Sequence, residues 1–235
     1  MCEAMSAEDA APSVPTYLRR HYWFAYLYPW TVAFWDHLLM VNLVLLGNYS
    51  RLRTITLKYF SSRPAGNVLQ IASVYGDLVP RLAAWTGENS GTFDLVDVLP
   101  LQLDTARRKI SDAKHVRFFN RDASNLGLPT AHYDHVLLYF LLHELPAEVR
   151  RETLREAFRV TKHGGEVVIV DFARPYWWNP FRYLWCVFLA IFEPYALGLW
   201  WHDIADMVPE DCRKLPRTHA RFFGGLFQMT IFTCQ

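Results

Sequence analysis

The chain has 235 residues, enough to bury the core of one domain together with an appended segment. Its formal net charge is +1, so the overall charge does not indicate a nucleic acid as a partner. Cys2, Cys186, Cys212 and Cys234 are too far apart to form a metal or redox motif, and they fit a reducing compartment best.

The first 65 residues divide into two parts that differ in charge. Residues 1–16 contain three acids and no Lys or Arg, and we expect a flexible tail there. Residues 17–65 contain six Lys or Arg and one acid, Asp36, and they are dense in Trp, Tyr and Phe. Two or three amphipathic helices are predicted in this segment, interrupted at Pro29 and at Gly47. Basic charge beside Trp and Tyr suits an anionic membrane surface.

Residues 66–173 show an alternating series of predicted strands and helices. Strands are expected at 68–72, 92–98, 116–120, 135–140 and 166–172, with helices at about 77–85, 101–114 and from Pro146 to Gly164. The apolar run at 135–140 is typical of a parallel strand buried on both faces. Residues 218–222 and 226–233 are predicted to form a hairpin of two edge strands. Together, 66–173 and 218–235 indicate an α/β sheet with a closing hairpin.

Residues 174–217 form an insertion between the fifth strand and the hairpin. Eight of the nine Trp residues lie outside 66–171, and four of them fall in 177–200. This concentration in two flanking segments indicates a shared surface that faces a membrane or a lipophilic substrate. The alternative is an aromatic core beneath a helical cap.

The flanking segments are too short in apolar sequence to span a bilayer. Their longest charge-free stretches are 21–35, 38–50 and 183–192, whereas a spanning helix needs about 20 apolar residues. The N-terminus also lacks the pattern of a secretory signal. We therefore expect a peripheral membrane protein on a cytoplasmic membrane face, either of the bacterial inner membrane or, in a mitochondrion, on the matrix side.

The turn after the first strand occupies the place of a nucleotide-binding loop. Asp97 follows Gly76 by twenty-one residues and ends the second strand. In doubly wound folds an acid at this distance accepts hydrogen bonds from a ribose diol. The positions that usually hold glycine are occupied by Ala72, Val74 and Gly76. The position that usually holds the first acid of the loop is occupied by Gln70. The site has therefore either lost its ligand or holds it in an altered way.

Three further motifs carry a resemblance to a known family. They are Tyr133-Asp134 with 141–146, Arg159-Val160 with 164–171, and 223–228 in the hairpin. With the loop at 70–78, they resemble class I S-adenosylmethionine-dependent methyltransferases over about residues 66–172 and the hairpin. The most similar branch modifies ubiquinone and menaquinone rings. Within it, the glycine-poor loop and the aromatic flanks are similar to the rhodoquinone biosynthesis proteins.

The resemblance implies a fold, a reaction and its ligands. The fold is a Rossmann-like class I methyltransferase sheet with a C-terminal β-hairpin, an N-terminal helical segment and an aromatic insertion. The family converts ubiquinone to rhodoquinone by replacing a ring methoxy group with an amino group. It uses S-adenosylmethionine as amino donor, with Mn²⁺ assisting. Two alternatives stay open: a conventional S-adenosylmethionine-dependent quinone methyltransferase, and a non-catalytic quinone-binding protein.

Cofactor-binding residues are expected after the first three strands. Asp97 is predicted to bind the ribose hydroxyls. Asp122 and Ala123 follow the third strand, where relatives place an acid against the adenine amino group, although Asp122 equally suits a cap of the turn before Ser124. The resemblance does not indicate an oligomeric state.

The loop itself is expected to contact the methionine part of the cofactor through Gln70, Ala72, Val74, Tyr75 and Gly76. Val74 and Tyr75 add bulk where glycines normally let the backbone approach a ligand. Gln70 replaces an acid that, in relatives, helps to hold the cofactor's ammonium group, and a neutral amide does not favour the charged amine. We hypothesise that Gln70 and Val74 redirect the cofactor from methyl donation to amine donation. The alternative is that Gln70 has only a structural role, as a polar side chain that packs in a polar site.

The candidate catalytic residues follow the fourth strand. Tyr139 would face the ligand there, although buried packing explains it equally well. His143 suits a proton acceptor, or a metal ligand together with Glu144; similar His residues in methylating relatives position the substrate. His202 and Asp206 are weaker metal candidates, expected one turn apart on one helix, and they fit surface positions as well.

Overall fold

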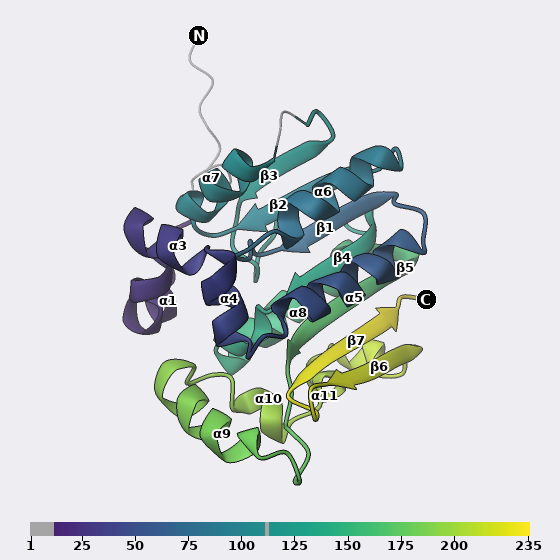
Figure 1. Ribbon diagram of the computed structural model, residues 1–235. Coiled ribbons are helices and arrows are strands. Elements are labelled where there is room, and N and C mark those ends of the chain that lie inside the picture. Colours follow the sequence, from purple (N-terminus) through teal and green to yellow (C-terminus); the bar gives the residue numbers. More distant parts are fainter. Residues whose placement is uncertain (1–11, 111–112) are drawn as a thin grey trace.

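A computed structural model describes residues 12–110 and 113–235, and its centre is a seven-stranded sheet (Figure 1). The strand order is β3-β2-β1-β4-β5-β7-β6. The strands are β1 (Asn67–Ile71), β2 (Thr92–Asp97), β3 (Val116–Asn120), β4 (Tyr133–Tyr139), β5 (Thr161–Phe172), β6 (Arg217–Phe222) and β7 (Phe227–Thr233). The first five are parallel, whereas β7 runs antiparallel to both β5 and β6. The predicted α/β sheet with its closing hairpin is confirmed.

Helices cover both faces of the sheet (Figure 1). One face packs against α5 (Tyr49–Ser61), α6 (Leu78–Glu88) and α7 (Pro100–Lys109), and the other packs against α8 (Ala147–Val160). Side chains alternate along a strand, so Val68 of β1 faces the first group while Leu69 and Ile71 face the second. Burial on both faces explains the continuous apolar runs of the central strands.

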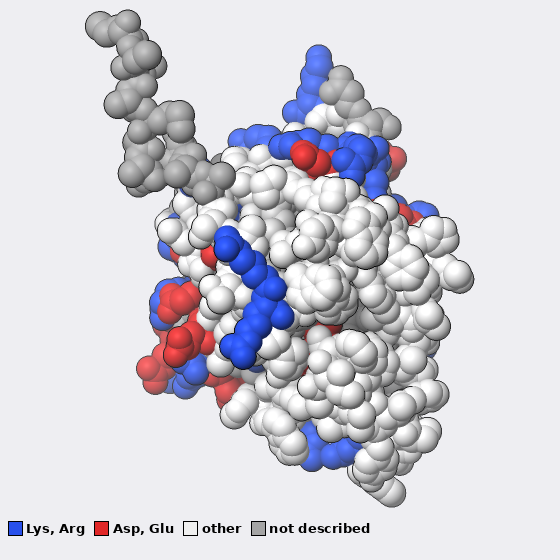
Figure 2. Space-filling view, turned by 90° about the vertical axis from the view of Figure 1, so that its left-hand side faces the viewer, with Lys and Arg blue, Asp and Glu red and all other residues white. Residues whose placement is uncertain are grey.

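Two further sets of short helices lie beyond the carboxyl ends of the parallel strands (Figure 1). The N-terminal set consists of α1 (Thr16–His21), α2 (Trp23–Tyr26), α3 (Pro29–Trp35) and α4 (Leu38–Val44). The insertion contributes α9 (Phe181–Phe192) and α10 (Gly198–Trp201) to the second set, whereas its α11 (Ile204–Met207) packs against α8 and is followed by η3 (Glu210–Cys212). Figure 2 views the molecule from the side on which several of these helices lie and shows a broad area without charged side chains.

Several details differ from the sequence-based predictions. The segment 17–65 contains five helices, α1 to α5, rather than two or three. The helix α8 ends at Val160 instead of reaching Gly164, because Thr161 already pairs with Tyr133 of β4. The expected flexible tail falls mainly on residues 1–11, which lie outside the described residues. Within the described ranges, no helix has the length and hydropathy that crossing a membrane requires.

Candidate active site

A cavity of about 590 Å³ lies at the carboxyl edge of β1 to β4, between the N-terminal helices and the insertion. In open parallel sheets this edge gathers the loops that bind ligands. The sheet side of its lining comprises Ala72 to Tyr75, Asp97 to Leu99, Arg121 to Ala123, Tyr139 to Leu141 and His143 to Leu145. The helical side includes residues of each helix from α1 to α5, together with Trp185, Phe188, Phe192 and Glu193.

The first half of the loop after β1 is supported from beneath by Gln70. This side chain is fully buried and does not line the cavity. Its Nε2 donates a hydrogen bond to the carbonyl of Ala72 at 3.0 Å, and its Oε1 has no partner among the described residues. Ala72 has a φ of +68°, a left-handed conformation that costs a residue other than glycine about 1–2 kcal/mol. The loop therefore keeps a backbone shape suited to glycine although the glycine is absent.

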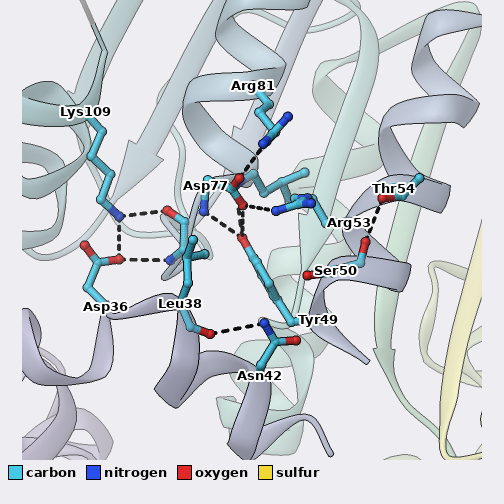
Figure 3. Close-up of polar contacts among 12 residues, drawn as sticks. Asp36, Leu38, Asn42, Tyr49, Ser50, Arg53, Thr54, Asp77, Arg81 and Lys109 are labelled. Carbon is cyan, nitrogen blue, oxygen red and sulfur yellow. Dashed lines mark hydrogen bonds and ion pairs between the residues drawn. The ribbon is translucent and has the colours of Figure 1, made fainter. Parts of the chain in front are cut away.

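The second half of the loop is anchored to α5 (Figure 3). The hydroxyl of Tyr49 accepts hydrogen bonds from the backbone N–H groups of Asp77 and Leu78, at 2.8 and 3.1 Å. The carboxylate of Asp77 also pairs with Arg53 and Arg81, at 2.5 and 2.6 Å. Although burial opposes it, these two guanidinium groups lower the pKa of Asp77. The start of α6 is thereby fixed against the N-terminal segment.

Gly76 is held on its other side by the Asp36–Lys109 ion pair (Figure 3). Its N–H donates to Asp36 at 2.9 Å, and its carbonyl accepts from Lys109 Nζ at 2.8 Å. Its φ is +89°, and a Cβ at this position would overlap the ring of Tyr49. Gly76 does not line the cavity. Its glycine identity is therefore explained by the contact with α5, and its predicted contact with a cofactor stays a prediction.

Val74 and Tyr75 do line the cavity. The Tyr75 ring stacks on Tyr26 of α2, with centroids 5.6 Å apart and planes at 19°. Its hydroxyl donates to the carbonyl of Ala25 and accepts from Gln102 Nε2 at 3.1 Å. The bulk that replaces glycine thus joins the loop to the N-terminal helices.

Asp97 ends β2 and faces the cavity. Its Oδ2 accepts a hydrogen bond from the N–H of Ser73 and its Oδ1 accepts one from the N–H of Leu99, both at 2.8 Å. Burial raises the pKa of Asp97 to about 6, while these backbone bonds oppose the shift. Each carboxylate oxygen can accept a second hydrogen bond. Asp97 therefore retains the acceptor capacity that a ribose diol requires.

Asp122 caps the turn after β3. Its Oδ1 accepts hydrogen bonds from the N–H and the hydroxyl of Ser124, at 2.8 and 2.6 Å. This is the turn-capping alternative that the sequence left open. Asp122 and Ala123 nevertheless line the cavity beside Arg121, so the cap and the predicted adenine contact are compatible.

A buried group of titratable side chains lies on η2 (Leu142–Glu144), directly after β4. His143 Nδ1 lies 2.9 Å from Asp171 Oδ1, and its backbone N–H donates to Asp171 Oδ2 at 3.3 Å. Burial lowers the pKa of His143, but the Asp171 carboxylate outweighs this and raises it to about 9. His143 is therefore charged at neutral pH, and its Nε2 lies 3.9 Å from Glu144.

Glu144 accepts a hydrogen bond from the Tyr26 hydroxyl. Burial, with the nearby Glu193 carboxylate, raises the pKa of Glu144 to about 8, although His143 opposes the shift. Burial also raises the pKa of Glu193. The Glu193 Oε2 is buried and has no partner among the described residues. These side chains can give and take protons close to neutral pH.

Three predicted catalytic residues thus meet in one cavity, with partners that the sequence analysis missed. Tyr139 lines it with a buried hydroxyl that has no partner among the described residues. Glu193 and Tyr26 were not predicted. A signal for Glu193 was available, because it is the only acid between residues 174 and 201.

The weaker metal candidates lie elsewhere. His202 and Asp206 are exposed and do not line the cavity. They were expected on one helix, which is wrong: α10 ends at Trp201, and Asp203 begins α11 by accepting a hydrogen bond from the N–H of Ala205 at 2.9 Å. Across residues 12–110 and 113–235, no group of three or more His, Cys, Asp or Glu side chains is placed to hold a metal ion. The described residues therefore give no support for a manganese site.

The strand order, the antiparallel β7 and the cavity at the carboxyl edge define a class I methyltransferase fold. Residues 68–165 match a family described as a methyltransferase domain. The structure is similar to a SAM-dependent methyltransferase from Aquifex aeolicus, with a TM-score of 0.56 and 19% identity over 81% of this chain and 95% of that one. An O-methyltransferase family protein from Burkholderia thailandensis gives a TM-score of 0.60 and 19% identity over 87% and 62%.

The sequence is also similar to curated quinone enzymes. It is 32% identical over 140 residues to the ubiquinone/menaquinone biosynthesis C-methyltransferase UbiE of Ectopseudomonas mendocina, covering 58% of this chain and 54% of the relative. The corresponding protein of Azotobacter vinelandii is also 32% identical over 140 residues, with the same coverage. The chain thus spans about half the length of the curated relatives it matches. The sequence is therefore similar to these quinone methyltransferases over that part, and the structure has a class I methyltransferase fold.

Proposed function

We propose that this chain is an S-adenosylmethionine-dependent transferase that modifies the ring of a long-tailed quinone. The observation that carries the proposal is a single cavity in which Asp97, the His143–Glu144 pair and an apolar wall occur together. The substrate class comes from the relatives, whose printed name is ubiquinone/menaquinone biosynthesis C-methyltransferase.

The polar end of the cavity fits S-adenosylmethionine. Asp97 would hold the ribose hydroxyls, because its oxygens keep acceptor capacity beside two backbone donors. Asp122 and Ala123 line the part of the cavity after β3, where adenine would lie. The bound co-substrate supplies the group that is transferred to the ring.

The other end of the cavity fits a quinone. Its walls include Met40 and Val44 of α4 and Trp185 and Phe188 of α9, which offer apolar surface to a ring and its tail. A charged His143 can donate a hydrogen bond to a quinone oxygen. Glu144, with its pKa near 8, can take or return a proton at the ring.

Methyl transfer to a ring carbon is the reaction that the relatives' name supports. A carbon–carbon bond forms at the ring, the sulfur–methyl bond breaks, and S-adenosylhomocysteine leaves. The proton displaced from the ring carbon needs an acceptor, and Glu144 can take it once ionised, a form that its raised pKa of about 8 favours only at higher pH.

Amino transfer is the second candidate, and Gln70 favours it. The neutral amide stands where, in relatives, an acid would favour the charged ammonium group. Because Gln70 is buried beneath the loop and does not line the cavity, it would act through the charge that it leaves out rather than by direct contact. The nitrogen would bond to a ring carbon while the methoxy group leaves as methanol. The bond between nitrogen and the former α-carbon then breaks: the quinone ring accepts two electrons, and water hydrolyses the resulting imine.

Two labelled forms of S-adenosylmethionine distinguish these reactions. Purified protein is incubated with ubiquinone, or with a demethylated quinol, and with co-substrate labelled either in the methyl carbon or in the amino nitrogen, with and without Mn²⁺. Methyl label in the quinone establishes methyl transfer, and nitrogen label establishes amino transfer. A quinone that carries neither label contradicts the proposed function.

The residue-level part of the amino-transfer candidate has its own test. Replacing Gln70 with Glu restores a carboxylate and should depress amination at fixed pH, because it favours the charged amine. Asn67→Asp, at the start of the same strand, is the control for an added acid. Unchanged amination in Gln70→Glu would remove this residue from the mechanism.

A further inference from the structure

The exposed large apolar side chains of the described residues are confined to two segments. One is 23–43 and the other is 176–201, and the sheet with its covering helices contributes none. The residues are Trp23, Tyr28, Trp30, Phe34, Leu38, Leu39 and Leu43 in the first segment, and Tyr176, Trp177, Trp178, Phe181, Tyr183, Leu184, Val187, Ile191, Phe192 and Trp201 in the second. An exposed apolar surface of this extent marks an interaction site. We call these residues the apolar face.

The apolar face is continuous with the cavity. Leu43 of α4 is 66% exposed and Phe192 of α9 is 46% exposed, yet both line the cavity. Their neighbours Met40 and Phe188 line it as well. The cavity therefore reaches the surface at Leu43 of α4 and at Phe192 of α9, and this part of its rim belongs to the apolar face.

Charge around the apolar face favours a lipid surface as the occupant. Neither of the two acids in these segments adds an unpaired negative charge to the apolar face, because Asp36 pairs with Lys109 and Glu193 lines the cavity. Arg19, Arg20 and Arg51 are exposed on adjoining helices. Figure 2 shows the charge-free area with Lys and Arg side chains next to it. Apolar and aromatic side chains beside basic ones bind bilayers that contain anionic lipids, whereas a second copy would bring like charges together.

We propose that the apolar face lies on a bilayer containing anionic lipids, and that the substrate's tail passes between α4 and α9 while its ring occupies the cavity. The tail part rests on the proposed function; the docking part does not. Withdrawing a tail from lipid costs about 0.8 kcal/mol for each CH₂ group. A passage that opens directly onto the bilayer lets most of the tail remain in lipid, so this cost is avoided.

Docking is tested by co-sedimentation with vesicles of phosphatidylcholine and phosphatidylglycerol. The unmodified protein should pellet with the vesicles. Val187→Glu with Ile191→Glu, two exposed positions that do not line the cavity, should weaken binding by about tenfold or more. Arg151→Gln with Arg155→Gln on α8 changes the net charge equally and should bind like the unmodified protein. Protein that stays in the supernatant, or that forms a dimer in light scattering and ignores vesicles, overturns docking.

The passage is tested by two substitutions on α4 that differ only in position. Leu43→Asp and Leu39→Asp add the same charge at sites that are 66% and 68% exposed, but only Leu43 lines the cavity. With binding to vesicles matched, Leu43→Asp should raise the KM for a long-tailed quinone about tenfold more than the KM for a short-tailed one. Leu39→Asp should leave the ratio of the two KM values unchanged. Equal ratios in both variants overturn the passage, whereas absence of any quinone turnover contradicts the proposed function and leaves the vesicle result standing.

Discussion

At the scale of single residues, Asp97 combines acceptor capacity with burial. Two backbone N–H groups orient its carboxylate, and burial raises its pKa from 3.8 to about 6. Because this pKa is raised in the folded state, the associated stability is fully present below pH 3.8 and is lost as the pH rises through about 6. At neutral pH the protein thus keeps a charged acceptor at some cost in stability, as functional sites often do.

Replacing Asp97 with Asn should weaken binding of S-adenosylmethionine. A hydrogen bond to a charged group contributes about 1.5–3 kcal/mol, so affinity should fall about tenfold to a hundredfold in calorimetry at pH 8. Asp104→Asn, on the exposed side of α7, is the control and should bind normally. Equal affinity in the two variants would show that Asp97 does not contact the co-substrate.

The group around Glu144 predicts a shift in a pH profile. Activity that needs ionised Glu144 should rise as the pH passes through about 8. The groups that act on this carboxyl are Tyr26, His143, Asp171 and Glu193. Glu193 raises the pKa of Glu144, so Glu193→Gln should move the midpoint to lower pH. Glu148→Gln, exposed on α8, should leave it unchanged, and an upward shift in Glu193→Gln would contradict this assignment.

At the scale of elements, the loop after β1 is held by the N-terminal helices. Tyr49 and Arg53 of α5 bind Asp77, and Asp36, after α3, binds Gly76. Tyr75 stacks on α2. The N-terminal segment is therefore a structural part of the site, although it lies outside the matched methyltransferase domain.

Substitutions at two glycines distinguish the cost of a strained backbone from the cost of the close contact between Gly76 and Tyr49 of α5. Gly76→Ala should lower the free energy of unfolding by about 1–2 kcal/mol for its positive φ and by about 1–3 kcal/mol more for the overlap with Tyr49. Gly164 has a similar φ of +79° with nothing within 4 Å, so Gly164→Ala should show the first cost alone. Urea unfolding measures both. Equal losses of unfolding free energy in the two variants would mean that the loop shifts to accommodate the added Cβ and that the contact with Tyr49 adds no cost.

The helices and strands were predicted correctly where burial determines the pattern of apolar and polar residues along the sequence. The parallel strands and the hairpin follow from apolar runs and from glycines at turns, and these local signals match the structure. The junctions depend on partners that are distant in sequence. Thr161 leaves α8 because it pairs with Tyr133 of β4, and Asp203 separates α10 from α11 by capping the second helix.

At the scale of the whole molecule, the site arises where three parts of the chain meet. The sheet supplies Asp97 and His143, the N-terminal helices supply Tyr26, and the insertion supplies Glu193. The sequence could predict the sheet residues, because strand ends place them at one edge. It could not predict Tyr26 beside Glu144, a hydrogen bond across 118 positions of sequence, since nothing local specifies that contact.

The proposed function requires this cavity to transfer a group from S-adenosylmethionine to a quinone. The most direct test is mass spectrometry of ubiquinone and its demethylated precursor after incubation in vesicles with the purified protein and S-adenosylmethionine, with and without Mn²⁺. We expect a quinone that has gained a methyl group, or that has exchanged a methoxy group for an amino group, and we expect neither product from Asp97→Asn. Unchanged quinones with the unmodified protein, or equal conversion by Asp97→Asn, would contradict the proposed function.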